Sequence, residues 1–430
     1  MVGLITDIPN SLKIAYPDKA VETMVQEELV FRPRLSREIP AGSKLTDGYE
    51  IRFGARLSPA QNVAQIGDGA NFPIPKDATD RQFIFKPTIF AGDYQIGLLT
   101  RFVANSNVAA FNGGEMRRRP EEVMSNLGKH IEQAYVGTAG DGIRGYVESD
   151  GVNTLVVKRP YQLDLLPENL YITVRQTPAG AVRDSLDLRQ ITDRNLDTRT
   201  LTYSGADQTA VANDPIYVTS ETTQTLTSIF ANGLRGQIDD GTNNDLIHTL
   251  SRSAAGNSKL KSPTSSNGGE LRAWTEQIML QLVHDTRKRS GKTPSTIVLG
   301  PGQVERYIDF VAPFRRFNVS PGQRQGKTLG YQMDDLKLDA PGVSFDFILS
   351  FDCLMREAYG LSWDCFFLYE AVRLQWLSGH DLGQLLLLPG SNGAAHKAAW
   401  GAYLVSVENF GTDFPLASCV WRDLKDRGDL

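Results

Sequence analysis

The sequence contains little cysteine: Cys353, Cys365 and Cys419 are its three cysteines in 430 residues, and no two have CxxC spacing. This pattern argues against a disulfide framework and against a zinc knuckle, so we expect three buried thiols. No stretch resembles a membrane span. The longest apolar run near the C-terminus, at 385–388, is far shorter than the ~20 residues that cross a bilayer. Since the first residues lack a signal-peptide pattern, we expect assembly in a cytoplasm and no membrane partner.

Motifs of catalysis are missing as well. The five histidines are scattered without HExxH spacing, and "GLSWD" at 360–364 departs from the GxSxG elbow of serine hydrolases at its last position. The net charge of −5 provides no global basic field to attract nucleic acid. We therefore predict no catalytic residue, no metal site and no cofactor, and the protein is not expected to be an enzyme.

One glycine-rich stretch, "GTAGDG" at 137–142, has the composition of a phosphate-binding loop. A dinucleotide fingerprint needs a strand before its glycines and a helix after them, whereas here a helical pattern comes first. Val123, Leu127, Ile131 and Tyr135 recur at i+4 and predict a helix over about 120–136, begun by Pro120. We therefore interpret Gly137 as the glycine that ends this helix, in a left-handed or tightly turned conformation.

The order of the other patterns predicts an α+β fold rather than a repeating βαβ fold. Residues 1–48 form a proline-broken arm, and 49–96 read as two strands joined by a long loop. Because an isolated hairpin is marginal in water, we expect Phe83, Ile84 and Phe85 to be buried mainly against other subunits. Residues 146–218 are β-rich, and helical patterns recur over 270–290 and from Pro301, on either side of a buried strand.

Two basic clusters are candidate contact sites. The cluster at 287–292 closes a predicted helix, where cations are favourable for the dipole, so we interpret it as structural. Arg117, Arg118 and Arg119 instead precede the predicted helix start at Pro120, where cations are unfavourable unless they are paired. We therefore expect this arginine cluster to contact acidic groups of a neighbouring subunit or the phosphates of a nucleic acid.

This arrangement resembles the major capsid proteins of tailed bacteriophages of the Hong Kong 97 type. The segment "FKPTIFAGDYQIGLLTRF" is similar to the strand that returns from the family's extended loop, and "EEVMSNLGKHIEQAYVGTAGDGIRG" to its spine helix and closing turn. Residues 270–310 resemble the helix, strand and helix of its axial domain, and 398–424 its closing strands. The resemblance implies an arm at 1–48, an extended hairpin loop at 49–96, a peripheral domain at 97–218 with an elaborated region at 146–218, an axial domain at 219–395, and C-terminal strands at 396–430 that return to the peripheral domain.

The resemblance also implies a function. The chain is expected to assemble with itself, as hexamers and pentamers, into an icosahedral virion shell around double-stranded DNA. Scaffolding, portal and decoration proteins are the further expected partners, and packaged DNA is held without sequence specificity. Two alternatives stay open: a nanocompartment shell around a protein cargo, and an enzyme with a β-rich binding domain.

Overall fold

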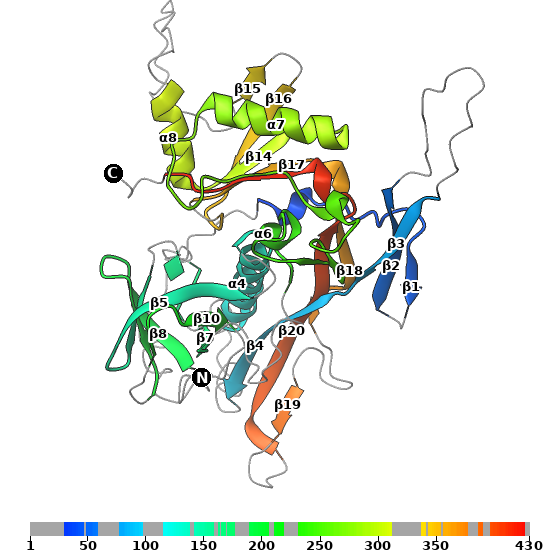
Figure 1. Cartoon of the computed structure of the whole chain (residues 1–430). Helices are drawn as coiled ribbons and strands as arrows, with labels where there is room; N and C mark the ends of the chain where they lie inside the picture. The colour runs from blue at the N-terminus through cyan, green and yellow to red at the C-terminus, as the bar shows by residue number, and fades with distance from the viewer. Residues whose placement is uncertain are drawn as a thin grey trace, which may run out of the picture. The chain divides into compact units, whose positions relative to one another are not determined.

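The computed structural model describes residues 30–46, 49–58, 77–97, 115–137, 142–158, 162–163, 165–168, 170–176, 189–205, 210–218, 231–311, 337–340, 343–353, 356–376, 386–389 and 396–425 (Figure 1). These residues fall into two compact units. The first contains the described parts of 87–132 and 370–408, and the second contains those of 30–86, 133–369 and 409–425. Of the arm predicted at 1–48, residues 1–29 and 47–48 lie outside the described residues.

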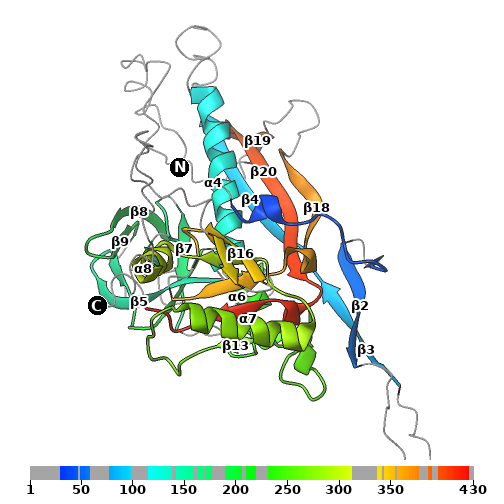
Figure 2. The ribbon, with the colours of Figure 1, turned by 90° about the horizontal axis from the view of Figure 1, so that it is seen from above.

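The first unit contains most of a four-stranded sheet and most of a long helix. The sheet contains β18 (Phe366–Trp376), β19 (Leu386–Pro389) and β20 (His396–Thr412), and β4 (Thr88–Gly97) pairs with β20 over ten residues from Thr88↔Glu408 to Gly97↔Ala399. The helix α4 (Glu115–Gly137) lies along β4 and β20 (Figure 2). A Cβ atom on Gly92 would lie 3.0 Å from Val123, so this glycine lets the helix approach the sheet closely.

Helix α4 confirms the helix predicted from the i+4 pattern, but it begins five residues earlier than expected. Leu127 and Ile131 are buried in the first unit, and Tyr135 is buried in the second. Glu, Met and Arg in 115–119 have high helix propensity, and the helix continues through Pro120, which lies in its second turn. The prediction placed too much weight on this proline as a first residue.

In the second unit, β5 (Ile143–Gly151), β6 (Thr154–Val157), β7 (Tyr171–Val174), β8 (Arg189–Asn195), β9 (Thr200–Tyr203) and β10 (Pro215–Val218) close into a barrel in the order β10-β5-β6-β9-β8-β7 (Figure 1). Inward-facing aliphatic residues such as Val147, Leu155, Ile191 and Ile216 are fully buried and form a separate core. The β-rich region predicted at 146–218 is therefore a closed barrel with its own interior.

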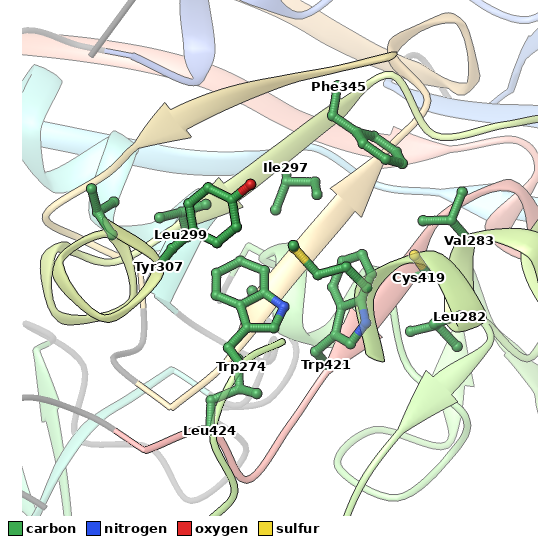
Figure 3. Packing of buried hydrophobic residues seen from close by; sticks show 13 residues of the cluster. Trp274, Leu282, Val283, Ile297, Leu299, Tyr307, Phe345, Cys419, Trp421 and Leu424 are labelled. Atoms are coloured by element: carbon green, nitrogen blue, oxygen red, sulfur yellow. The ribbon is translucent and has the colours of Figure 1, made fainter. Parts of the chain in front are cut away.

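A six-stranded sheet in the second unit has the order β13-β21-β17-β14-β16-β15. Its strands are β13 (Thr264–Ser265), β14 (Thr296–Leu299), β15 (Lys337–Ala340), β16 (Val343–Leu349), β17 (Ala358–Leu361) and β21 (Cys419–Trp421). Residues of α7 (Glu276–Ser290) and α8 (Pro301–Val311) pack with this sheet around Trp274 and Trp421, whose ring centroids are 6.1 Å apart (Figure 3). The predicted helix at 270–290 begins at Glu276 because the Thr275 side chain caps it.

The hairpin predicted within 49–96 is present as β2 (Glu50–Ser58) and β3 (Thr79–Phe85), with β1 (Lys44–Thr46) added to β2. The expected burial against other subunits is wrong for Phe83 and Phe85, whereas Ile84 is half-buried within this chain. Phe83 and Phe85 are 1% and 2% exposed within this chain. They pack with Phe53, Phe367 and Ile247, because the body of the second unit supplies the aromatic surface that the hairpin lacks.

Short elements connect these parts of the second unit: η2 (Arg32–Arg34), α6 (Leu234–Gln237), β11 (Leu246–Ile247), β12 (Leu250–Ser251), η4 (Ser258–Leu260), η7 (Trp363–Cys365) and η8 (Pro415–Ala417). The C-terminal strands pair in two different sheets. Residues 399–408 pair with β4, but β21 pairs with β17 and β13 in the six-stranded sheet. The fully buried run Cys419–Trp421 explains this, since it suits a central strand.

Candidate functional site

The arginine cluster lies in the first turns of α4 and not before the helix. Arg117, Arg118 and Arg119 follow Glu115, the first helical residue, and their side chains are outside the described part of the structure. The first turn carries the positive end of the helix dipole, so the position remains unfavourable for cations. Their expected contact with acidic groups or phosphates therefore stays a prediction.

Gly137 is the last residue of α4. Of the two conformations that we expected, the left-handed one is wrong, since the φ of Gly137 is outside the positive range, whereas Gly142 has φ 73°. The tight turn stays a prediction, because residues 138–141 lie outside the described residues. A Cβ atom on Gly137 would lie 3.2 Å from the carbonyl oxygen of Asp352 and 3.5 Å from Leu165. Close packing at the helix end, and not a left-handed cap, is thus the reason why glycine fits here.

The root of the hairpin is organised around a buried histidine. The ring of His248 lies 5.2 Å from that of Phe83 and 5.2 Å from that of Phe85, and its Nε2 atom lies 3.0 Å from the carbonyl oxygen of Thr412. The backbone carbonyl of His248 also accepts a hydrogen bond from the Ile84 amide, at 3.2 Å. Burial lowers the pKa of His248 to about 4, with a smaller effect of the Arg252 charge in the same direction. The side chain is therefore a neutral structural partner at pH 7.

A buried charge network joins β21 to the loop after α6. Arg422 forms ion pairs with Asp239 and with Glu357, and the latter also pairs with Arg235 at 3.4 Å. The carboxylate of Asp239 is fully buried. It accepts hydrogen bonds of 2.9 to 3.0 Å from the backbone amides of Gly241, Asn243 and Asn244. Tyr359 donates to Glu357 at 2.5 Å, and burial followed by the Glu357 charge raises the pKa of this phenol. The network fixes the geometry of the loop after α6.

A second polar cluster lies where α7 ends. Lys292 Nζ lies 2.9 Å from the Asp364 carboxylate and 3.2 Å from the sulfur of Cys365. Burial raises the pKa of Cys365 to about 11 against the lowering effect of Lys292, so the thiol stays protonated and unreactive. Cys353 and Cys419 are also free and buried, which confirms the prediction of three buried thiols.

Pockets occur among the described residues of the second unit. One of about 310 Å³ is lined by Phe53, Arg56, Lys259 and Pro415 among others, and one of about 590 Å³ by Arg144, Lys158, Glu357 and Arg422 among others. Within the described ranges no three His, Cys, Asp or Glu side chains are grouped as metal ligands. No helix in that part of the chain is both long and apolar enough to cross a membrane.

Sequence reasoning missed His248 and the Arg422 network. The turn signals in "DDGTNND" at 239–245 mark the loop that Asp239 organises, but its partner Arg422 is 183 residues away. Likewise nothing near His248 indicates that Phe53, Phe83 and Thr412 surround it. Such sites depend on tertiary contacts that a local pattern does not encode.

Comparison with solved structures identifies the fold. The chain is similar to a subunit of the cyanophage A-1(L) capsid asymmetric unit, with a TM-score of 0.55 and 13% identity, over 94% of this chain and 96% of that one. The chain has the fold of a phage capsid protein. A structure from Mycobacterium phage Ogopogo matches with a TM-score of 0.44 and 11% identity, over 96% of this chain and 98% of that one. The capsid of an empty GTA particle matches with a TM-score of 0.45 and 6% identity, over 94% of this chain and 94% of that one.

The assignment of the capsid fold depends on the cyanophage structure, whose match covers nearly the whole of both chains. No protein-family model matches the sequence, and no curated protein matches it. At such low identity the likeness concerns the path of the chain and not individual side chains. The mixed α+β fold that we predicted is thereby confirmed at the level of the capsid fold.

Proposed function

We propose that the protein is the major capsid protein of a tailed phage and assembles with itself into an icosahedral shell around double-stranded DNA. The observation that carries this proposal is the likeness to the cyanophage capsid subunit over 94% of the chain. A match of this extent includes the helix, the hairpin and the large sheet together, so it does not depend on one common motif. The protein thus acts as a structural subunit rather than as an enzyme.

The parts take roles in this proposal. Helix α4 is the spine helix, the six-stranded sheet with α7 and α8 is the axial domain, and β2 with β3 is the base of the extended loop. Hexamers and pentamers form the shell, with scaffolding, portal and decoration proteins as further partners. Assembly takes place in the host cytoplasm, and the virion is the final location.

The charge of the chain supports a shell that does not bind packaged DNA tightly. Attraction to phosphate scales with the number of cations presented, and the chain carries 45 basic against 50 acidic residues. The arginine cluster at 117–119 is the local exception and the proposed contact with a neighbour or the genome. Electron microscopy of particles made from the purified chain tests the shell, and nuclease-protected DNA in particles from infected cells tests its content.

A further inference from the structure

The pocket of about 590 Å³ in the second unit has a wall rich in cations. Five basic side chains line it: Arg144 on β5, Lys158 directly after β6, Arg235 on α6, Arg356 before β17 and Arg422 directly after β21. The first two belong to the barrel and the other three to the rest of the second unit. Folding thus gathers cations that are far apart in the sequence around one pocket.

The two carboxylates of the pocket wall, Glu357 and Asp423, already have partners inside the chain. Glu357 pairs with Arg235 at 3.4 Å and accepts the Tyr359 hydroxyl at 2.5 Å. Asp423 accepts hydrogen bonds of 2.7 and 3.1 Å from two backbone amides. The wall therefore presents more positive than negative charge to the pocket.

Three further carboxylates act on the arginines without lining the pocket. Asp239 and Asp240 pair with Arg422, and the charge of Asp352 acts on Arg144. Carboxylates in such positions hold a guanidinium in place, and its remaining N–H groups stay available to a ligand. Together with the two carboxylates of the wall they balance the five cations. We therefore expect the pocket to attract an anion at short range and not through a long-range field.

Two cations of the wall are withdrawn from solvent. Arg144 and Arg422 are 5% and 8% exposed. Burial lowers the pKa of Arg144 to about 10, so its side chain is still cationic at pH 7. The Nε atom of Arg422 is buried and donates no hydrogen bond within the described residues, since its ion-pair partner Glu357 is 3.9 Å away. A buried donor without an acceptor is unfavourable, and an anion bound in the pocket supplies the acceptor.

The wall favours phosphate among anions. A phosphate group carries about −1.5 to −2 charges near pH 7 and has three acceptor oxygens, so it can accept hydrogen bonds from cations on several sides. A carboxylate has one charge and two oxygens, which a single arginine fork satisfies. A DNA duplex cannot reach Arg144 and Arg422, because both are almost fully buried. The pocket volume is within the range of about 300 to 1,000 Å³ that holds small ligands.

We propose that this pocket binds the phosphate group of a small molecule. Arg144 and Lys158 donate to it from the barrel, and Arg356 and Arg422 donate from the rest of the second unit. The bound group thus bridges the two parts and stabilises the folded chain, because it binds the folded and not the unfolded state. The inference goes beyond the proposed shell function and does not depend on assembly.

The test is isothermal titration calorimetry of the purified full-length chain with inorganic phosphate and, separately, with adenosine monophosphate, at fixed ionic strength in a chloride buffer. We expect saturable one-to-one binding. Lys158→Glu should weaken it at least about tenfold, because a repulsive charge replaces an attractive one in the wall. Lys158 is exposed, so this variant should fold, and an unchanged unfolding midpoint without phosphate verifies it. The control is Lys44→Glu, which makes the same charge change at an exposed position on β1 and should bind like the unchanged chain.

The two ligands distinguish the sources of the phosphate group. Tighter binding of adenosine monophosphate than of inorganic phosphate would assign the pocket to a phosphorylated small molecule, and equal affinities would assign it to the phosphate group alone. The inference is overturned if neither ligand binds saturably, or if Lys158→Glu binds both as well as the Lys44→Glu control does. Each of these results leaves the shell function untouched, since microscopy of assembled particles tests that function separately.

Discussion

His248 Nε2 lies 3.0 Å from the carbonyl oxygen of Thr412, and the His248 ring contacts the rings of Phe53, Phe83 and Phe85. The contact ties the turn between β11 and β12 to the end of β20, at the point where the hairpin leaves the body. Gly411 belongs to the same arrangement, since a Cβ atom there would lie 2.8 Å from Phe85 and 2.9 Å from the His248 ring. The hairpin root is therefore packed tightly around a neutral imidazole.

Acid should weaken this root. The pKa of His248 is lowered from 6.5 to about 4 on folding, so between these values the unfolded chain binds the proton and the folded chain does not. The neutral His248 therefore makes its full contribution to the free energy of unfolding above pH 6.5. This free energy falls by about 3 kcal/mol in total as the pH falls toward 4. Denaturant unfolding at pH 7 and pH 4.5 measures it, and His248→Gln should lose less stability between these pH values than the unchanged chain.

The matched control is His284→Gln, because His284 is exposed on α7. This variant should show the same pH dependence as the unchanged protein. An equal loss of stability in His248→Gln and in the unchanged chain would mean that other groups cause the acid sensitivity.

Substitution of Gly137 should destabilise the end of α4 by packing and not by backbone strain. Valine there would push against Asp352 and Leu165, and overpacking of this kind costs on the order of 1 to 3 kcal/mol. Thermal and denaturant unfolding of Gly137→Val gives the value. Gly54→Ala is the control, because a Cβ atom on Gly54 meets nothing within 4 Å and its φ is not positive, so it should be close to neutral.

Loss of Arg422 should be among the most damaging single changes in the second unit. Arg422→Ala leaves the fully buried Asp239 without the arginine that pairs with it and removes one of the two arginines that pair with Glu357. Breaking a buried pair in this way costs about 3 to 5 kcal/mol. In contrast, Arg56 and Asp80 form an exposed pair at 3.2 Å, with 70% and 59% of the side chains exposed. Arg56→Ala should therefore cost under about 1 kcal/mol, and similar values for the two variants would refute the role of the network.

The arginine cluster should matter for assembly more than for folding. Replacing Arg117, Arg118 and Arg119 with serine removes cations from the first turns of α4, which is favourable for the helix dipole, but serine has a lower helix propensity than arginine. The two effects oppose each other, so the stability of the isolated subunit should change little. Particle yield and DNA content should drop. The control replaces Arg287, Lys288 and Arg289, which are exposed in the last turn of α7, and should leave both unchanged. Normal particles with normal DNA content from the first variant would contradict the predicted contact.

Sequence patterns predicted elements well where one local rule decides them. The i+4 stripe through Leu127 and Ile131 indicated α4, and alternation around Phe53 and Phe83 indicated the hairpin, because burial of one face is encoded every two or four residues. The strand alternation could not show that Phe83 is buried within the same chain. Phe367, which belongs to the same buried cluster, is 284 residues away, and a local pattern does not encode such a tertiary contact. Closure of the barrel likewise depends on β10 pairing with both β5 and β7.

The central claim, that this chain builds a closed shell, is tested most directly by cryo-electron microscopy of the full-length protein purified alone and concentrated under assembly conditions. We expect closed particles with icosahedral symmetry, in which hexamers and pentamers repeat the fold described above. A small discrete oligomer that stays unchanged over a wide range of protein and salt concentrations would contradict the claim. It would favour an enzyme or a binding protein that has the fold of a capsid protein.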